Sequence, residues 1–159
     1  MINDVTSTRR LAVNAAFLKD IKDDNHHLKV LVDKIAPMVS HREIAMNHWP
    51  ELVDLFAELR DQLAFHFSLE EAFGYFDEAI DTSPELSINA EALRSQHTSL
   101  FESIRHLTET ASDLTAEDEE RIGRVLVRYE QFLRAFANHE EAELKLILEA
   151  FDDDLGVGD

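Results

Sequence analysis

Two His-x-x-x-Glu pairs are the residues of this chain best suited to chemistry. His66 is followed four residues later by Glu70, and His139 is followed by Glu143. Residues four apart on a helix lie one above the other on the same face, so each pair presents an imidazole nitrogen and a carboxylate to one small volume. A polar side chain directed into a core is costly unless it has a partner. A metal ion is a partner that would suit both pairs.

Two single histidines extend this set of candidate metal ligands. His97 lies between the two pairs, and His27 lies before them. His27 is about 40° round the helix from Leu31, whereas His26 points about 160° away from Leu28, so the spacing favours His27 and leaves His26 as the alternative. Nearby, Asp24 sits on the apolar stripe, either as an acceptor for the ring N–H of His27 or as the mark of a local helix distortion.

The composition limits which metal the site can hold and which partners the protein can have. The chain has no cysteine, which excludes disulfides, iron–sulfur clusters and thiolate zinc sites. Imidazole nitrogen and carboxylate oxygen suit iron, with manganese or zinc as substitutes. The formal net charge is −18, which argues against nucleic acid and anionic membrane surfaces as partners.

The sequence predicts a cytoplasmic protein. No apolar run approaches the ~18 residues that a membrane span requires. Arg9 and Arg10 precede a short apolar run over residues 11–18, which weakly resembles a secretion signal. Asn14 interrupts that run, and its apolar spacing continues into a helical stripe, so we expect no signal peptide.

The elements that must position these residues are helices. The chain has only 4 glycines and 3 prolines and lacks strand-like alternation, which predicts an all-α fold. We expect long helices over residues 10–35, 50–79, 84–111 and 115–151. Pro37 should end the first, Pro50 and Pro84 fit first turns, and Ser83 is a good N-cap. Capping boxes are expected over residues 40–43 and 115–118.

Four long helices with short connections predict an up-down-up-down four-helix bundle. We expect a single domain over residues 1–159, with the bundle over about 10–151 and a loosely packed acidic tail over 152–159. Apolar residues recur at spacings of three and four along each of the last three helices, and each stripe is interrupted by ligand-type residues. The interrupting residues are His66 and Glu70, His97, and His139 and Glu143.

Other polar and aromatic residues receive structural interpretations. His41, His48 and His106 are expected at the surface. A solvated acidic face should hold Glu71, Glu140 and Glu141, any one of which could also support a ligand. Phenylalanines are expected in the core, where some would keep a metal site dry; they are Phe65, Phe67, Phe73, Phe101, Phe132 and Phe136.

The ordered ligand set resembles the hemerythrin-like (HHE) domain family. It comprises His27 in DDNHHLKVLV, His66 and Glu70 in AFHFSLEE, His97 in LRSQHTSLF, and His139 and Glu143 in ANHEEAELKLI. The resemblance covers about residues 15–150. It implies a non-haem di-iron centre inside a four-helix bundle, with two iron ions joined by carboxylates and by an oxo or hydroxo bridge.

The pattern departs from that of the oxygen-carrier hemerythrins. Those proteins have His-x-x-x-His on the third helix, where this chain has Phe101, and His-x-x-x-x-Asp on the fourth, where Glu143 follows His139 by four. Four histidines, two bridging glutamates and one bridging oxygen leave about two of the coordination positions of two octahedral irons for water or substrate. An additional open position favours redox reaction over reversible O₂ carriage.

The expected function is that of a non-haem di-iron protein that binds or reacts with O₂, peroxide or nitric oxide, as a sensor, scavenger or store. A redox enzyme and a binding protein are equally compatible with the residues, and the physiological ligand and oligomeric state stay open. One alternative is an iron-handling protein, although the Glu-x-x-His motif of ferritin-like bundles does not occur. Another is a metal-free helical interaction module. A hydrolytic zinc enzyme fits poorly because there is no His-Glu-x-x-His motif.

Overall fold

The computed structural model describes the backbone of residues 2–72 and 84–157, and within these the side chains of residues 19–71 and 84–149. All the regular structure in these ranges is helical, as the sequence predicts. Helix α1 spans Ile2–Val39, α2 spans Arg42–Asn47, and α3 spans Trp49–Ala72. Helix α5 spans Pro84–Ser112 and α6 spans Glu119–Val157.

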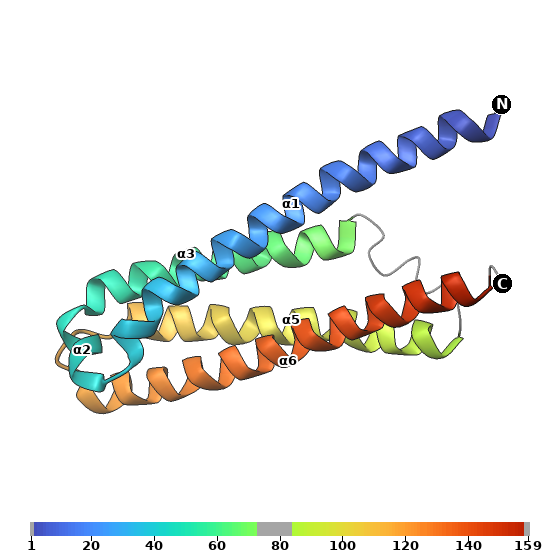
Figure 1. Cartoon of the computed structure of the whole chain (residues 1–159). Helices are drawn as coiled ribbons and strands as arrows, with labels where there is room; N and C mark the ends of the chain where they lie inside the picture. Colours follow the sequence, from blue (N-terminus) through green and yellow to red (C-terminus); the bar gives the residue numbers. More distant parts are fainter. Residues whose placement is uncertain (1, 73–83, 158–159) are drawn as a thin grey trace.

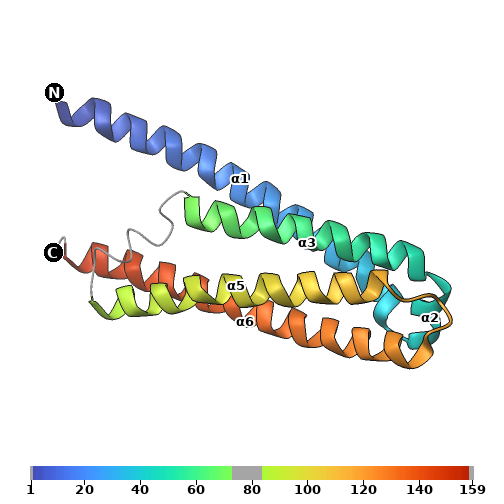
Figure 2. The same cartoon turned by 180° about the vertical axis from the view of Figure 1, so that it is seen from behind.

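The four long helices lie alongside one another (Figure 1), and the view from behind agrees (Figure 2). Helices α1 and α5 run toward the end that holds α2, whereas α3 and α6 run away from it. Side-by-side packing joins α1 to α3, α3 to α5 and α5 to α6. At one end α2 contacts both α1 and α6, and toward the other end α1 and α6 draw apart. Side chains from different helices therefore meet in the interior between the helices.

Prolines and caps set several of the helix ends. Pro84 is the first residue of α5 and Pro50 is the second of α3, as expected of a residue without a backbone N–H. Pro37 does not end α1, which continues to Val39. Pro37 lies in the last turn of α1, so the hydrogen bond that it removes and the clash of its ring with the preceding turn affect only the end of the helix. The proposed cap at Ser83 lies outside the described residues, as do residues 73–79 of the predicted second long helix.

Only one of the two predicted capping boxes has any of its hydrogen bonds. Asp118 Oδ2 accepts the backbone N–H of Thr115 at 2.9 Å, just before α6 begins. At α2 the cap residue is His41 and its side chain makes no capping hydrogen bond, while the Ser40 hydroxyl donates to the Pro37 carbonyl instead. The first and last helices are also longer than predicted. Helix α6 continues to Val157, so the backbone of residues 152–157 is helical.

Two apolar clusters lie on either side of a polar layer. The larger cluster fills the α2 end, and its fully buried members include Trp49, Phe56 and Leu63. A smaller cluster joins α5 to α6 through Leu86, Ala90, Leu93 and Leu146. Within the described residues no helix is long and apolar enough to cross a membrane. The layer between the clusters holds the buried ligand-type residues.

Candidate metal centre

In each His-x-x-x-Glu pair the histidine contacts its own glutamate one turn later on the same helix face. On α3, His66 Nε2 lies 2.6 Å from Glu70 Oε1, and on α6, His139 Nε2 lies 2.6 Å from Glu143 Oε1. All four side chains are buried. Both pairs occur at the inward-facing positions that the apolar stripes predicted, which places two nitrogens and two carboxylates in the interior.

Glu70 connects the two pairs to the single histidine of α5. Its Oε2 lies 2.7 Å from His97 Nε2 and 3.8 Å from His139 Nε2. His97 Nε2 is also 3.1 Å from Glu143 Oε1, and the His97 and His139 rings have centroids 4.9 Å apart. Side chains from α3, α5 and α6 thus converge on one small volume.

The ligand-type atoms form two groups that share one carboxylate. In each group the candidate atoms all lie within 4.8 Å of one another. The first group contains Glu70, His97, His139 and Glu143, and the second contains His66, Glu70 and Glu140. A shared carboxylate can place one oxygen on each of two cations, so the arrangement is suited to a pair of metal ions.

The outer nitrogen of each buried imidazole is held by a second side chain. The Nδ1 of His66 is hydrogen-bonded to Asp24 Oδ2. His97 Nδ1 lies 3.0 Å from Glu71 Oε1, and His139 Nδ1 lies 2.8 Å from Gln96 Oε1. Metal-binding histidines typically use their second nitrogen in this way, which fixes the ring orientation. All three rings consequently direct Nε2 into the cluster.

The carboxylates strongly favour protonated imidazoles in the metal-free cluster. Burial alone would lower the pKa of His66, but hydrogen bonds to Asp24, Glu140 and Glu70 outweigh it and raise the pKa to about 12. The same balance of burial against carboxylate hydrogen bonds raises the pKa of His97 to about 10 and that of His139 to about 9. In the metal-free cluster the protonated imidazoles balance the negative charge of the carboxylates. A divalent cation could balance the same charge.

The acidic members of the cluster respond to the same environment in opposite ways. Burial would raise the pKa of Glu70, but the nearby imidazoles of His139, His66 and His97 hold it well below its usual range. For Glu140, burial prevails over the hydrogen bond to His66 and raises the pKa. Glu70 is therefore an ionised carboxylate at neutral pH, which is the form that binds a metal.

The hydrogen bonds of the side chains do not satisfy the cluster completely. Glu70 Oε2 and His139 Nε2 are buried, and among the described residues neither has a partner at hydrogen-bond angles, although atoms of opposite charge lie close. Buried polar atoms normally have such partners. A lone pair on each of these atoms directed at a shared cation would meet the requirement, so the residues present fit a metal centre.

Aromatic rings surround the cluster. The Phe67 ring is stacked on His97 with centroids 4.6 Å apart, and it meets His139 edge-on at 6.1 Å. Phe136 meets His66 edge-on at 5.6 Å. Among the phenylalanines expected in the core, Phe65 is instead half exposed at the surface, and Phe73 lies outside the described residues. The rings that touch the histidines lower the local polarity, which strengthens electrostatic interactions within the cluster.

Most of the chain matches a known protein family. The model of the hemerythrin HHE cation-binding domain matches residues 16–151. The chain belongs to this family. Neither the curated proteins nor the solved structures include a significant match. The cation-binding character of the family agrees with the two groups of ligand atoms. The matched range contains every residue of both groups.

One predicted ligand of this hemerythrin domain does not reach the cluster. His27 is exposed and belongs to neither group of ligand atoms, and His26 is exposed too. The buried polar residue of α1 is Asp24, only 3 % exposed. Asp24 lies one turn before the buried Leu28 and shares its face, whereas His27 is rotated by about 100° from that face. Asp24 accepts a hydrogen bond from His66, whereas the sequence predicts an acceptor for His27 or a helix distortion.

The sequence places Glu71 and Glu140 on a solvated acidic face and gives no signal for Gln96, but in the structure all three contact the buried histidines. Glu140 Oε1 lies 2.7 Å from His66 Nε2, and Glu71 and Gln96 hold the outer nitrogens of the other two rings. Glu140 follows Phe136 by four residues and so lies at the edge of the inward stripe, a signal that could have identified it. The expected surface positions of His41, His48, His106 and Glu141 are confirmed.

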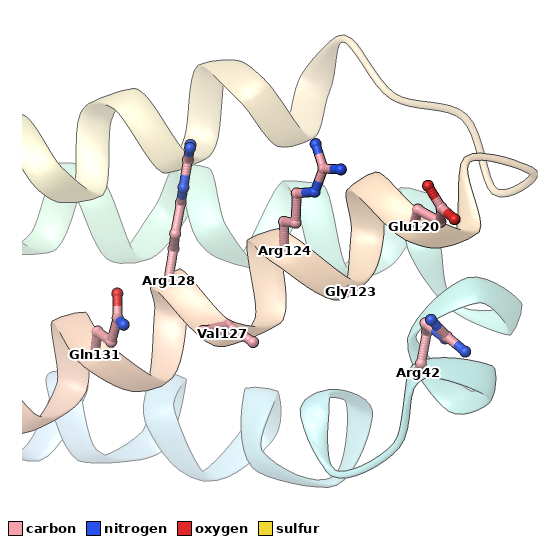
Figure 3. Close-up of a pocket in the computed structure, with 7 residues that line it drawn as sticks. All are labelled: Arg42, Glu120, Gly123, Arg124, Val127, Arg128 and Gln131. Atoms are coloured by element: carbon pink, nitrogen blue, oxygen red, sulfur yellow. The ribbon is translucent and has the colours of Figure 1, made fainter.

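One surface pocket lies beside the cluster, and another lies far from it. A surface pocket of about 490 Å³ reaches His97 and is lined by Phe67, Phe101, Glu71 and Arg105 among others. A larger pocket, of about 690 Å³, lies by α2 (Figure 3). There Arg124 and Arg128 extend toward α5, while Arg42 comes from α2 beside Gly123. Its lining residue Gly123 is about 24 Å along α6 from His139, at ~1.5 Å per residue.

Proposed function

We propose that this protein is a non-haem di-iron protein that binds or reacts with O₂ or a related small oxidant or diatomic, such as peroxide or nitric oxide. It would act as a sensor, scavenger or store. The observation that carries the proposal is the buried cluster in which two groups of nitrogen and oxygen ligands share Glu70. Membership of a cation-binding family supports the same conclusion.

Iron is the metal that we propose for both positions, with manganese or zinc as substitutes. The first group offers two imidazoles and two carboxylates, and the second offers one imidazole and two carboxylates. Mixed nitrogen and oxygen ligands suit iron in proteins. Bound iron would supply one-electron redox chemistry and open positions for a small ligand. The proposed architecture around it is an up-down-up-down bundle, consistent with the alternating helix directions.

The protein's own residues would control access and orientation. The pocket that reaches His97 offers a route for a small neutral molecule between Phe67 and Phe101. Phe101 occupies the position where the oxygen carriers have a histidine, so this chain supplies an apolar wall there in place of a further imidazole. Meanwhile Asp24, Glu71 and Gln96 hold the three rings in place from outside the cluster.

Two other functions remain compatible with part of these observations. An iron-handling protein would use the same ligands, and the exposed edge of Glu140, with a side chain 32 % exposed, would favour exchange of metal with solvent. A metal-free interaction module would need the cluster to be stable with protons alone. The raised pKa values of His66 and His97 correspond to such a proton-filled cluster, and metal analysis distinguishes it from an iron-loaded one.

The test is quantitation of iron after anaerobic purification with Fe(II), followed by absorption spectra before and after exposure to O₂. We expect close to two irons per chain and new near-ultraviolet absorption on oxidation. A protein that takes up no iron under these conditions would eliminate the proposal and leave the interaction module. Iron uptake without any spectral or redox response to O₂, peroxide or nitric oxide would favour iron handling.

A further inference from the structure

We propose that Glu140 is a metal ligand and that it completes, together with His66 and Glu70, a second and more weakly binding cation position. The inference rests on the proposed di-metal function and specifies that the two cation positions differ in affinity. His66 Nε2 lies 2.6 Å from Glu70 Oε1 and 2.7 Å from Glu140 Oε1. Two carboxylates from different helices thus meet at one inward-facing nitrogen.

The first helix provides the reason why Glu140 is needed. His27 is exposed, so α1 directs no imidazole toward His66. What α1 buries is Asp24, and both its oxygens are engaged, Oδ1 by the Gln62 amide at 2.7 Å and Oδ2 by His66 Nδ1. Asp24 therefore orients the ring from behind and leaves the metal-facing side open. The carboxylates on that side are Glu70 and Glu140.

The two positions differ in the chemistry of their ligands. The first offers the nitrogens of His97 and His139 with two carboxylates, all buried. The second offers a single nitrogen with two carboxylates, and the Glu140 side chain is 32 % exposed. Nitrogen-rich sites bind late first-row divalent metals more tightly, whereas oxygen-rich sites suit harder cations. The first position should therefore fill before the second, and the second should exchange its metal faster.

The experiment is a titration of the metal-free protein with Co(II), followed by calorimetry and by the visible absorption of the bound ion. The wild type should bind two equivalents in two steps of unequal affinity. Glu140→Gln removes the negative charge and keeps the size, so it should weaken the second step at least about tenfold and leave the first within about threefold. Glu141→Gln is the matched control, because it makes the same change at the next, exposed residue and should leave both steps unchanged.

A second variant separates this assignment from the one that the sequence favoured. His27→Ala should leave both Co(II) steps unchanged. Loss of the second step in His27→Ala with no change in Glu140→Gln would overturn the role of Glu140 and restore the histidine of α1 as ligand. A wild type that binds only one equivalent would also overturn the second position. A wild type that binds no Co(II) and no Fe(II) would remove the proposed function itself, which is a distinguishable result.

Discussion

The Nδ1–H of His66 on α3 donates a hydrogen bond to Oδ2 of Asp24 on α1. The contact crosses between two helices, and both side chains are buried. It fixes which nitrogen of His66 faces the cluster, since the nitrogen bound to Asp24 is directed outward. The role of α1 in the centre is therefore to orient an imidazole of its neighbour.

Replacing Asp24 should weaken metal binding without removing a direct ligand. In Asp24→Ala the ring of His66 loses its outer partner, and we expect metal affinity to fall by about 10- to 100-fold. Asp24→Asn keeps an acceptor oxygen and should have a smaller effect. The measurement is a Co(II) or Fe(II) titration, with the exposed neighbour changed in Asp23→Ala as the control. Equal affinities in Asp24→Ala and Asp23→Ala would contradict the orienting role.

The shared position of Glu70 predicts unequal effects of the two buried glutamates. Glu70 belongs to both groups of ligand atoms, whereas Glu143 belongs to only the first. Glu70→Gln should therefore reduce bound iron at both positions, to well below one per chain. Glu143→Gln should retain a larger fraction. Metal analysis of the variants purified side by side is decisive, and identical losses would argue against a bridging role for Glu70.

Metal removal should lower thermal stability at neutral pH. A cation that binds the folded chain and not the unfolded chain adds to the free energy of unfolding, by about 2.7 kcal/mol when its free concentration is 100 times Kd. For a domain of this size, that corresponds to a rise in Tm of roughly 5–10 °C. Calorimetry of the metal-loaded and chelator-treated protein measures the difference. No difference in Tm would mean that no cation binds selectively to the fold.

The metal-free protein should lose stability as the pH rises above neutrality. The folded pKa values of His97 and His139, about 10 and 9, exceed the unfolded value of about 6.5. Each imidazolium thus stabilises the fold fully below pH ~6.5, and that contribution is lost as pH rises through the folded pKa. We expect Tm to fall by roughly 5–10 °C between pH 7 and pH 10.

The control for this pH dependence is the metal-loaded protein. Metal-bound histidines are neutral, so they have no stabilising proton to lose as the pH rises. Its Tm should change less over the same range. A steeper fall of Tm with pH in the metal-loaded protein than in the metal-free protein would contradict the stabilisation of the metal-free cluster by protonated histidines.

The buried hydroxyl of Tyr129 predicts a stabilising substitution away from the centre. Tyr129 is 1 % exposed, and among the described residues its hydroxyl has no hydrogen-bond partner. Burial also raises the pKa of this tyrosine. Tyr129→Phe removes the unsatisfied group and keeps the ring against Phe56, so the free energy of unfolding should rise by about 1 kcal/mol. Thermal denaturation tests this, and a clear fall in Tm would reveal a partner for the hydroxyl.

Much of the centre could be predicted from the sequence because helical periodicity is local. The inward positions of His66, Glu70, His97, His139 and Glu143 follow from long apolar stripes at spacings of three and four, and all five are buried. Regular helices with few glycines also made the all-α class predictable. Helices α1 and α6 are longer than the sequence predicts, because the polar residues at both chain ends lack an apolar stripe.

The register of α1 and the partners across helices depended on tertiary packing. Periodicity places Asp24 and His27 on neighbouring faces of one helix, and only the rotation of α1 against α3 decides which of them is buried. The contact of Glu140 with His66 joins residues 74 apart in the chain, and no local spacing encodes it. The sequence by itself determined which side chains each helix turns inward. The packing of the helices decided which of those side chains meet, because such contacts depend on how each helix is rotated about its axis and how far apart the helices lie.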